Sequence, residues 1–174
     1  MGDYFFVRDL EEEWKNLYEN IERFHNRFWE SIKRDYHRRP EFNRQSMEYN
    51  ELLIALPRLL PLAKELQNDE SLHCLMPWQH HGELDLLLMD WEKQTTQVFI
   101  TILPYILPDR ENEYQLSLYG QNLPLGNWNE VAQPLKTLES VPLGEIRSLI
   151  HAELQAKTVQ QPNPNIELIC PSLE

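Results

Sequence analysis

The stretch HCLMPWQHHGELD, residues 73–85, holds the most chemically versatile side chains of the sequence. It combines three histidines, a thiol and two carboxylates. These side chains are common zinc ligands, and a catalytic zinc site usually takes three protein ligands and keeps a fourth position open. Pro77 and Gly82 predict that the stretch is a loop leading into a strand. The first question is therefore whether this loop binds a metal.

Strand geometry decides which of these side chains can act together. In an extended chain, neighbouring side chains point to opposite faces, so His81 shares a face with Glu83 and Asp85, whereas His80 points away. A metal site would then use His81, Glu83 and Asp85. The same alternation is also typical of a half-buried strand with one solvent-facing side. Both interpretations stay open at this point: a metal-dependent enzyme, or a strand entrance without catalytic chemistry.

Other catalytic motifs are missing from the sequence. It contains no GxGxxG or GxxxxGK[ST] loop that would cradle a phosphate, and no GxSxG turn that would expose a nucleophilic serine. We therefore expect no cofactor, and the metal site remains the only enzymatic alternative.

The N-terminal segment has the most regular pattern. Apolar residues alternate spacings of three and four, which places them on one stripe of a long α-helix that ends before Pro40. A stripe with exposed aromatic side chains must be covered by the second helical region or by another chain, and the second case includes a homodimer. Its members are Val7, Leu10, Trp14, Leu17, Ile21, Phe24 and Phe28.

The leucine-rich segment that follows predicts two short helices, at about 46–55 and 57–67. Pro57 and Pro61 each lack a backbone donor and clash with the preceding turn, so we expect a kink or break near Leu56. The leucines of this segment supply enough apolar surface to pack as an antiparallel pair with the first helix.

Beyond residue 83 the apolar period changes from helical to alternating. Strands are expected at about 84–91, 96–103 and 112–120, followed by a turn-rich segment with a short helix near 128–133 and an amphipathic helix at 144–157. The predicted fold class is α+β: a long N-terminal helix paired with a proline-kinked second helix, an antiparallel β-meander of three or more strands, and a short C-terminal helix. We expect one domain over 1–156, comprising a helical part at 1–67 and the meander with its helix at 83–156, and a flexible tail at 157–174.

Charge and hydropathy limit the classes of partner. The net charge is −12, which argues against nucleic-acid binding and favours a basic protein partner. The segment from Glu22 to Arg44 carries a local balance of +3, which leaves −15 for the rest of the chain. No run of about 18 apolar residues is present to span a membrane, and no signal peptide is evident, so we expect a cytoplasmic protein. Its two cysteines, Cys74 and Cys170, are far apart and are expected to be reduced thiols.

Three short segments suggest a resemblance to a known family. The segments ALPRLLP (55–61), TTQVFITIL (95–103) and YQLSLYGQNLPL (114–125), followed by a short helix, resemble a family of small uncharacterised gammaproteobacterial proteins described as a domain of unknown function. The similarity covers about residues 49–154, but Gly120 stands where a His-Asp pair would be expected. The resemblance implies a bacterial cytosolic α+β domain and carries over no activity or site.

The combined pattern favours a non-enzymatic protein-binding or regulatory protein, of the adaptor, chaperone-like or immunity type, with a basic partner. Aromatic side chains and a charged loop tip are the best candidates for the contact surface. Those candidates are Trp14, Phe24, Phe28, Trp78, Tyr105, Asp109 and Trp128.

Overall fold

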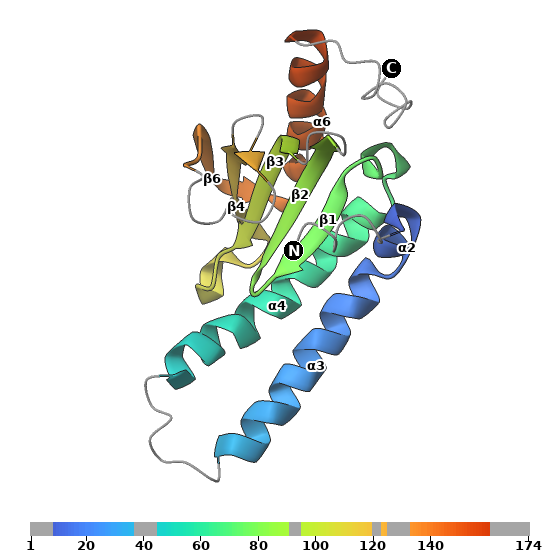
Figure 1. Ribbon diagram of the computed structural model, residues 1–174. Helices are drawn as coiled ribbons and strands as arrows, with labels where there is room; N and C mark the ends of the chain where they lie inside the picture. Colours follow the sequence, from blue (N-terminus) through green and yellow to red (C-terminus); the bar gives the residue numbers. More distant parts are fainter. Residues whose placement is uncertain (1–8, 37–44, 91–94, 120–122, 125–132, 161–174) are drawn as a thin grey trace.

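The computed structural model describes residues 9–36, 45–90, 95–119, 123–124 and 133–160. The described residues form helices and one antiparallel sheet, which confirms the predicted α+β class with a meander and a C-terminal helix (Figure 1). The strand order is β1-β2-β3-β4-β6, and β5 pairs with β3. The strands are β1 (Met76–His80), β2 (Glu83–Asp90), β3 (Thr95–Pro104), β4 (Glu113–Tyr119), β5 (Leu123–Pro124) and β6 (Lys136–Pro142). The helices are α2 (Leu10–Lys15), α3 (Leu17–Tyr36), α4 (Gln45–Gln67) and α6 (Leu143–Gln160), with the short 3-10 turns η2 (Glu70–Leu72) and η3 (Pro108–Arg110).

The predicted N-terminal helix is present as two pieces that meet at Asn16. Asp9 caps α2 by accepting a hydrogen bond from the backbone N–H of Glu11 at 3.0 Å. α3 then runs antiparallel to α4, as the stripe predicted (Figure 1). α6 ends at Gln160, three residues beyond the predicted start of the tail at residue 157, and residues 161–174 of the predicted tail lie outside the described residues.

The second helical region was expected to have a kink or a break near Leu56. The break was wrong, because α4 is one element of 23 residues that contains both prolines, and the expected kink is not contradicted. Pro57 and Pro61 lie four residues apart, which places both missing donors on the same side of the helix. Both prolines are partly exposed. Water can therefore satisfy the carbonyl groups that lose their intrahelical partners.

Three strands were not predicted: β5, which pairs with β3, and β1 and β6, which lie at the two edges of the sheet. β1 occupies the stretch that was expected to be a loop. Its Pro77 misled the prediction, but an edge strand tolerates a proline because one side of its backbone needs no ladder hydrogen bond. β6 is exposed along most of its length and therefore shows little apolar alternation. The short helix expected near 128–133 lies outside the described residues, apart from Gln133.

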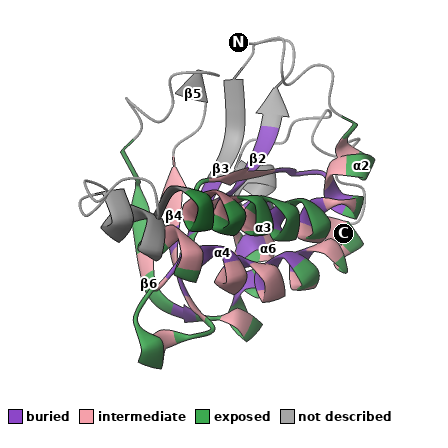
Figure 2. Cartoon of the chain, turned by 90° about the horizontal axis from the view of Figure 1, so that it is seen from below, coloured by how far each residue is buried: buried purple, intermediate pink, exposed green. Residues whose placement is uncertain are grey.

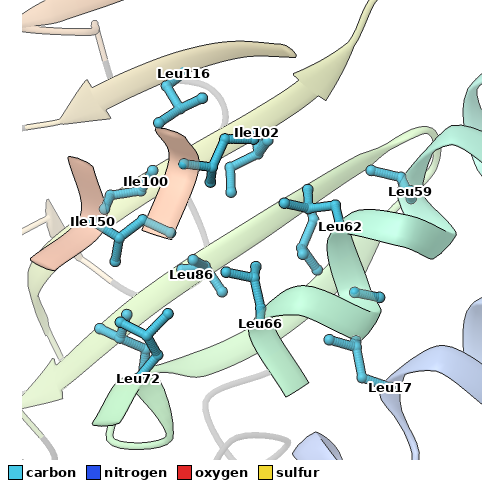
Figure 3. Close-up of a cluster of buried hydrophobic side chains, with 14 of the residues drawn as sticks. Leu17, Leu59, Leu62, Leu66, Leu72, Leu86, Ile100, Ile102, Leu116 and Ile150 are labelled. Carbon is cyan, nitrogen blue, oxygen red and sulfur yellow. The ribbon is translucent and has the colours of Figure 1, made fainter. Parts of the chain in front are cut away.

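The hydrophobic core lies between the sheet and the helices. α3, α4 and α6 all lie on one side of the sheet (Figure 2). The inward side chains of β2, β3 and β4 meet α4 and α6 in this layer, with η2 closing one end (Figure 3). Residues of this cluster include Leu59, Leu62, Leu66, Leu72, Leu86, Ile100, Ile102, Leu116 and Ile150.

Cys74 lies in the buried segment between η2 and β1 and is disulfide-bonded, so the expectation of a reduced thiol was wrong for this residue. The other cysteine of the sequence, Cys170, lies outside the described residues. Within the part of the chain that the structure describes, the helices are too short or too polar to cross a membrane.

Candidate functional site

The histidine-rich stretch forms a tight hairpin. His80 ends β1, Glu83 begins β2, and the two residues face each other across a turn made by His81 and Gly82. His81 adopts a positive φ of 52°, which is uncommon for a residue with a side chain. The side-chain amide of Gln79 donates a hydrogen bond to the carbonyl of His81 and supports this conformation.

The turn shifts which side chains share a face of the strand, and the prediction from the sequence had assumed no such shift. His80, and not His81, pairs with Glu83, at 3.5 Å between Nδ1 and Oε1. His81 instead lines a groove beside α4. Among the described residues, no group of three or more His, Cys, Asp or Glu side chains is placed to hold a metal ion. The set His81, Glu83 and Asp85 is therefore not assembled as a metal site.

Asp85 has the most unusual environment of the three. It is fully buried and points to the face of the sheet opposite Leu84 and Leu86, which face the helices. Burial, together with the charge of Glu83, raises the pKa of Asp85 from 3.8 to about 8. The Thr101 hydroxyl offsets part of this rise. Among the described residues, neither carboxylate oxygen of Asp85 has a partner that meets the geometry of a hydrogen bond. Asp85 is therefore a neutral carboxylic acid at pH 7.

The neighbours of Asp85 share this partly buried face. Burial raises the pKa of Glu83, and the nearby His80 opposes the rise. Burial likewise raises the pKa of Tyr119, with smaller contributions from Glu83 and Asp85. Trp78 lies opposite Asp85 on β1. This face can keep a proton on Asp85 near neutral pH, and it differs in chemistry from the groove beside α4.

A serine, a histidine and an aspartate also meet between η2 and α6, in a combination that the sequence argument did not identify. His151 Nε2 lies 3.1 Å from Ser71 Oγ and 3.0 Å from Asp69 Oδ2, and the Ser71 hydroxyl donates to Asp69 Oδ1 at 2.5 Å. In a catalytic triad the two ring nitrogens serve serine and aspartate separately. Here one nitrogen faces both partners and the serine proton goes to aspartate. The cluster therefore fastens α6 to η2 and is not a nucleophile relay.

The groove lies where α4, the β1–β2 turn and the end of β3 meet, and its volume is about 620 Å³. Gly82 allows the turn to approach α4 closely, because a Cβ atom at this position would lie 3.0 Å from the Ala55 Cβ. The lining is mostly apolar, with one carboxylate and one imidazole. The lining residues are Glu51, Leu52, Ala55, His81, Gly82, Leu103, Pro104, Tyr105 and Ile106.

Apolar side chains around this groove are exposed to solvent. Ile54, Leu103, Ile106 and Leu107 expose between 37% and 52% of their surface. Leu103 and Ile106 belong to the groove lining, and Ile54 and Leu107 come from α4 and from the loop after β3, which form its walls. Clustered exposed apolar residues of this kind mark interaction surfaces in soluble proteins.

The loop that presents Ile106 and Leu107 is held in place by hydrogen bonds. The Arg58 guanidinium on α4 donates to the carbonyl of Tyr105 and, at 2.8 Å, to that of Leu107. The Tyr114 hydroxyl donates to the Arg58 carbonyl at 2.5 Å, and burial raises the pKa of Tyr114 to about 12. These charge-assisted bonds fix the loop to α4.

Tyr105 is fixed from its other side as well. The Arg110 guanidinium stacks on the Tyr105 ring at 3.7 Å from the centroid. The Tyr105 hydroxyl accepts a hydrogen bond from the backbone N–H of Ser140 at 2.9 Å. Arg110 also pairs with Glu113 at 2.9 Å. The wall of the groove is thus preorganised, which lowers the entropic cost of binding a ligand.

The predicted contact residues have different positions in the structure. Trp14 is 1% exposed, its indole N–H donates to the Leu75 carbonyl at 2.7 Å, and its ring stacks on His73. Its prediction as a surface contact residue was therefore wrong. Tyr105 lines the groove, and Asp109 is exposed on the adjoining turn η3.

The remaining predicted contact residues lie elsewhere. Phe24 and Phe28 stack on each other on α3, and Phe24 is 39% exposed. Trp78 is half-buried on β1 beside Asp85, away from the groove. Trp128 lies outside the described residues. The groove itself was missed because its three walls come from separate segments, although the exposed Tyr-Ile-Leu loop was a usable signal.

Comparison with known proteins identifies no relative: no family model matches the chain, and no curated protein or solved structure shows significant similarity to it. The family resemblance noted from the sequence stays a prediction.

Proposed function

We propose that this protein is a protein-binding module whose groove takes an apolar segment flanked by basic residues from another polypeptide chain. The observation that carries the proposal is the apolar groove of about 620 Å³, with exposed apolar residues beside it and a wall loop that Arg58 fixes to α4. Proteins bind amphipathic helices in apolar grooves of this kind, with anchors spaced three and four residues apart.

Acidic residues at the groove support a partner with basic flanking residues. Glu51 lies in the lining, and Asp109 and Glu111 are exposed on the adjoining loop. No ion pair is recorded for these three carboxylates among the described residues, whereas the nearby cations are engaged: Arg58 by carbonyl groups and Arg110 by Glu113. The excess of acidic groups favours and orients a basic partner.

An adaptor, chaperone-like or immunity-type role and a cytoplasmic location belong to the same proposal. The net charge of −12 supports a basic partner in each of these roles. The described residues do not support the alternative of a metal-dependent enzyme, because no group of three His, Cys, Asp or Glu side chains among them is placed to hold a metal ion.

A defined peptide tests the groove. The probe is a fluorescein-labelled amphipathic peptide with leucine on one helical stripe and lysine elsewhere, and its binding is measured by fluorescence anisotropy. We expect the Ile106→Asp variant to bind it at least about tenfold more weakly than the wild type, because a charge enters the apolar wall. Ile106 is 37% exposed, so this substitution leaves the core intact.

Two controls accompany this titration. Leu135→Asp changes an apolar residue that is 73% exposed and outside the groove, and should bind like the wild type. A peptide with glutamate in place of lysine should bind more weakly than the lysine peptide. Equal affinity of the wild type and Ile106→Asp for the lysine peptide would overturn the proposal.

A further inference from the structure

One face of α3 has the chemistry that the groove is expected to recognise. Phe24 and Phe28 stack with ring centroids 6.3 Å apart and are only partly covered, although they lie on the stripe that is fully buried at Ile21. Residues three and four apart share a helix face, so Arg27 adjoins Phe24 and Arg34 continues the same flank. We call the residues Arg23, Phe24, Arg27, Phe28 and Arg34 the α3 flank.

The α3 flank has exposed cations without a recorded acidic partner. Arg23, Arg27 and Arg34 are exposed, and no ion pair is recorded for them among the described residues. Lys33, on the other side of the helix, differs because it pairs with Glu30 at 3.6 Å and lies over the Trp29 ring. The α3 flank is therefore both aromatic and basic.

We infer that the groove of one copy of this chain receives the α3 flank of a second copy. This inference rests on the proposed function and names the partner of the same site. Charge complementarity supports it, because the basic segment of +3 contains the α3 flank, whereas the rest of the chain carries −15. That acidic excess makes a nucleic acid or an anionic membrane a poor partner for the same helix.

The position of the two surfaces fits a closed pair. The groove lies where the β1–β2 turn meets α4, and α3 and α4 continue past this end of the sheet as a helical hairpin (Figure 1). When two copies are related by a two-fold axis, the groove of each copy can receive the α3 flank of the other. The dimer then has two identical contacts and leaves neither surface exposed. Two copies thus cover each other's Phe24 and Phe28.

The association state tests the inference, by light scattering on protein eluting from gel filtration. We expect the wild type to be a dimer that weakens as salt is raised, because charged groups contribute to the contact. Arg27→Glu, an exposed charge reversal, should weaken the dimer at least about tenfold. Trp29→Asp, on the opposite flank of α3, should leave it intact and is the matched control.

Mixing variants tests which surfaces meet. Arg27→Glu disables the α3 flank and Ile106→Asp disables the groove, so each alone should be monomeric. Their mixture should form a heterodimer, because the intact α3 flank of one variant meets the intact groove of the other. If α3 paired with α3 instead, Ile106→Asp alone would still dimerise, which would overturn the inference.

The outcome also separates this inference from the proposed function. A wild type that stays monomeric yet binds the leucine-lysine peptide overturns the dimer and leaves the groove function standing. A monomer that also fails to bind the peptide overturns both. Dissociation of the dimer by the same peptide supports both, because peptide and α3 flank then compete for one groove.

Discussion

Asp85 should make the protein less stable as the pH rises through neutrality. Its pKa is raised from 3.8 to about 8 in the folded state, because the carboxyl group is buried and because the nearby charge of Glu83 opposes its ionisation. Between these two values the unfolded chain releases the proton while the folded protein keeps it. The free energy of unfolding therefore falls with rising pH in this window, by about 1.4 kcal/mol per pH unit from this one group.

The size of the effect follows from the width of the window. From pH 4 to pH 7 Asp85 lowers the free energy of unfolding by roughly 4 kcal/mol, which is a large share of the stability of a small protein. Asp85→Asn keeps the size and polarity of the side chain and has no proton to lose. The variant should thus lack this pH dependence and be more stable than the wild type at pH 7 by a few kcal/mol.

Urea unfolding at several pH values, followed by tryptophan fluorescence, measures the difference between the two proteins. The advantage of Asp85→Asn should grow from pH 5 to pH 7, whereas Asp109→Asn, at an exposed carboxylate, should follow the wild type. An advantage that is absent or constant across this range would refute the assignment of Asp85 as a buried neutral acid.

Three further outcomes are expected. Gly82→Ala should cost about 1 kcal/mol or more of unfolding free energy, because its Cβ would meet the Ala55 Cβ at 3.0 Å, whereas Gly144→Ala has open space and should be neutral or stabilising; urea unfolding compares them. Asp69→Asn should destabilise the protein by about 1–2 kcal/mol at pH 7, because it weakens the attachment of α6. Burial would raise the pKa of Asp69, but hydrogen bonds from Ser71 and His151 outweigh burial and lower it. The cost of Asp69→Asn should therefore shrink as the pH falls below 4, and a cost that does not change with pH would contradict this role. Cys74 is disulfide-bonded, so protein denatured without reductant should show no free thiol from this residue by Ellman titration, and a reactive Cys74 identified by mass spectrometry would contradict the structure.

The predictable part of the fold was the part with strong local periodicity. Strand β4 alternates apolar and polar residues, β2 and β3 contain apolar runs of strand length, and α6 repeats its apolar residues at helical spacing. These four elements were therefore placed correctly. β1 was missed because Pro77 is a strand breaker except at an edge, and its edge position depends on the whole sheet. The continuous α4 was missed because Pro57 and Pro61 normally break a helix, and their partly exposed position is known only from the folded structure.

The candidate site was less predictable, because it depends on contacts between distant segments. The helical stripe groups Trp14 with Phe24. Only the folded structure shows that Trp14 is buried against the segment that holds His73 and Leu75, whereas Phe24 is left partly open. The assignment of His81 to the side of Glu83 assumed an uninterrupted strand. A turn at His81 itself, with positive φ, placed His80 there instead.

The most direct test of the groove as a binding site is to locate the bound peptide by amide chemical-shift mapping. Isotope-labelled Arg27→Glu protein, whose groove is intact, is titrated with the leucine-lysine peptide. The account predicts that the largest shifts fall at Leu52, Gly82 and Ile106, which come from three separate segments of the groove. Shifts confined to α6 or β6, or no shifts at these three amides, would contradict it.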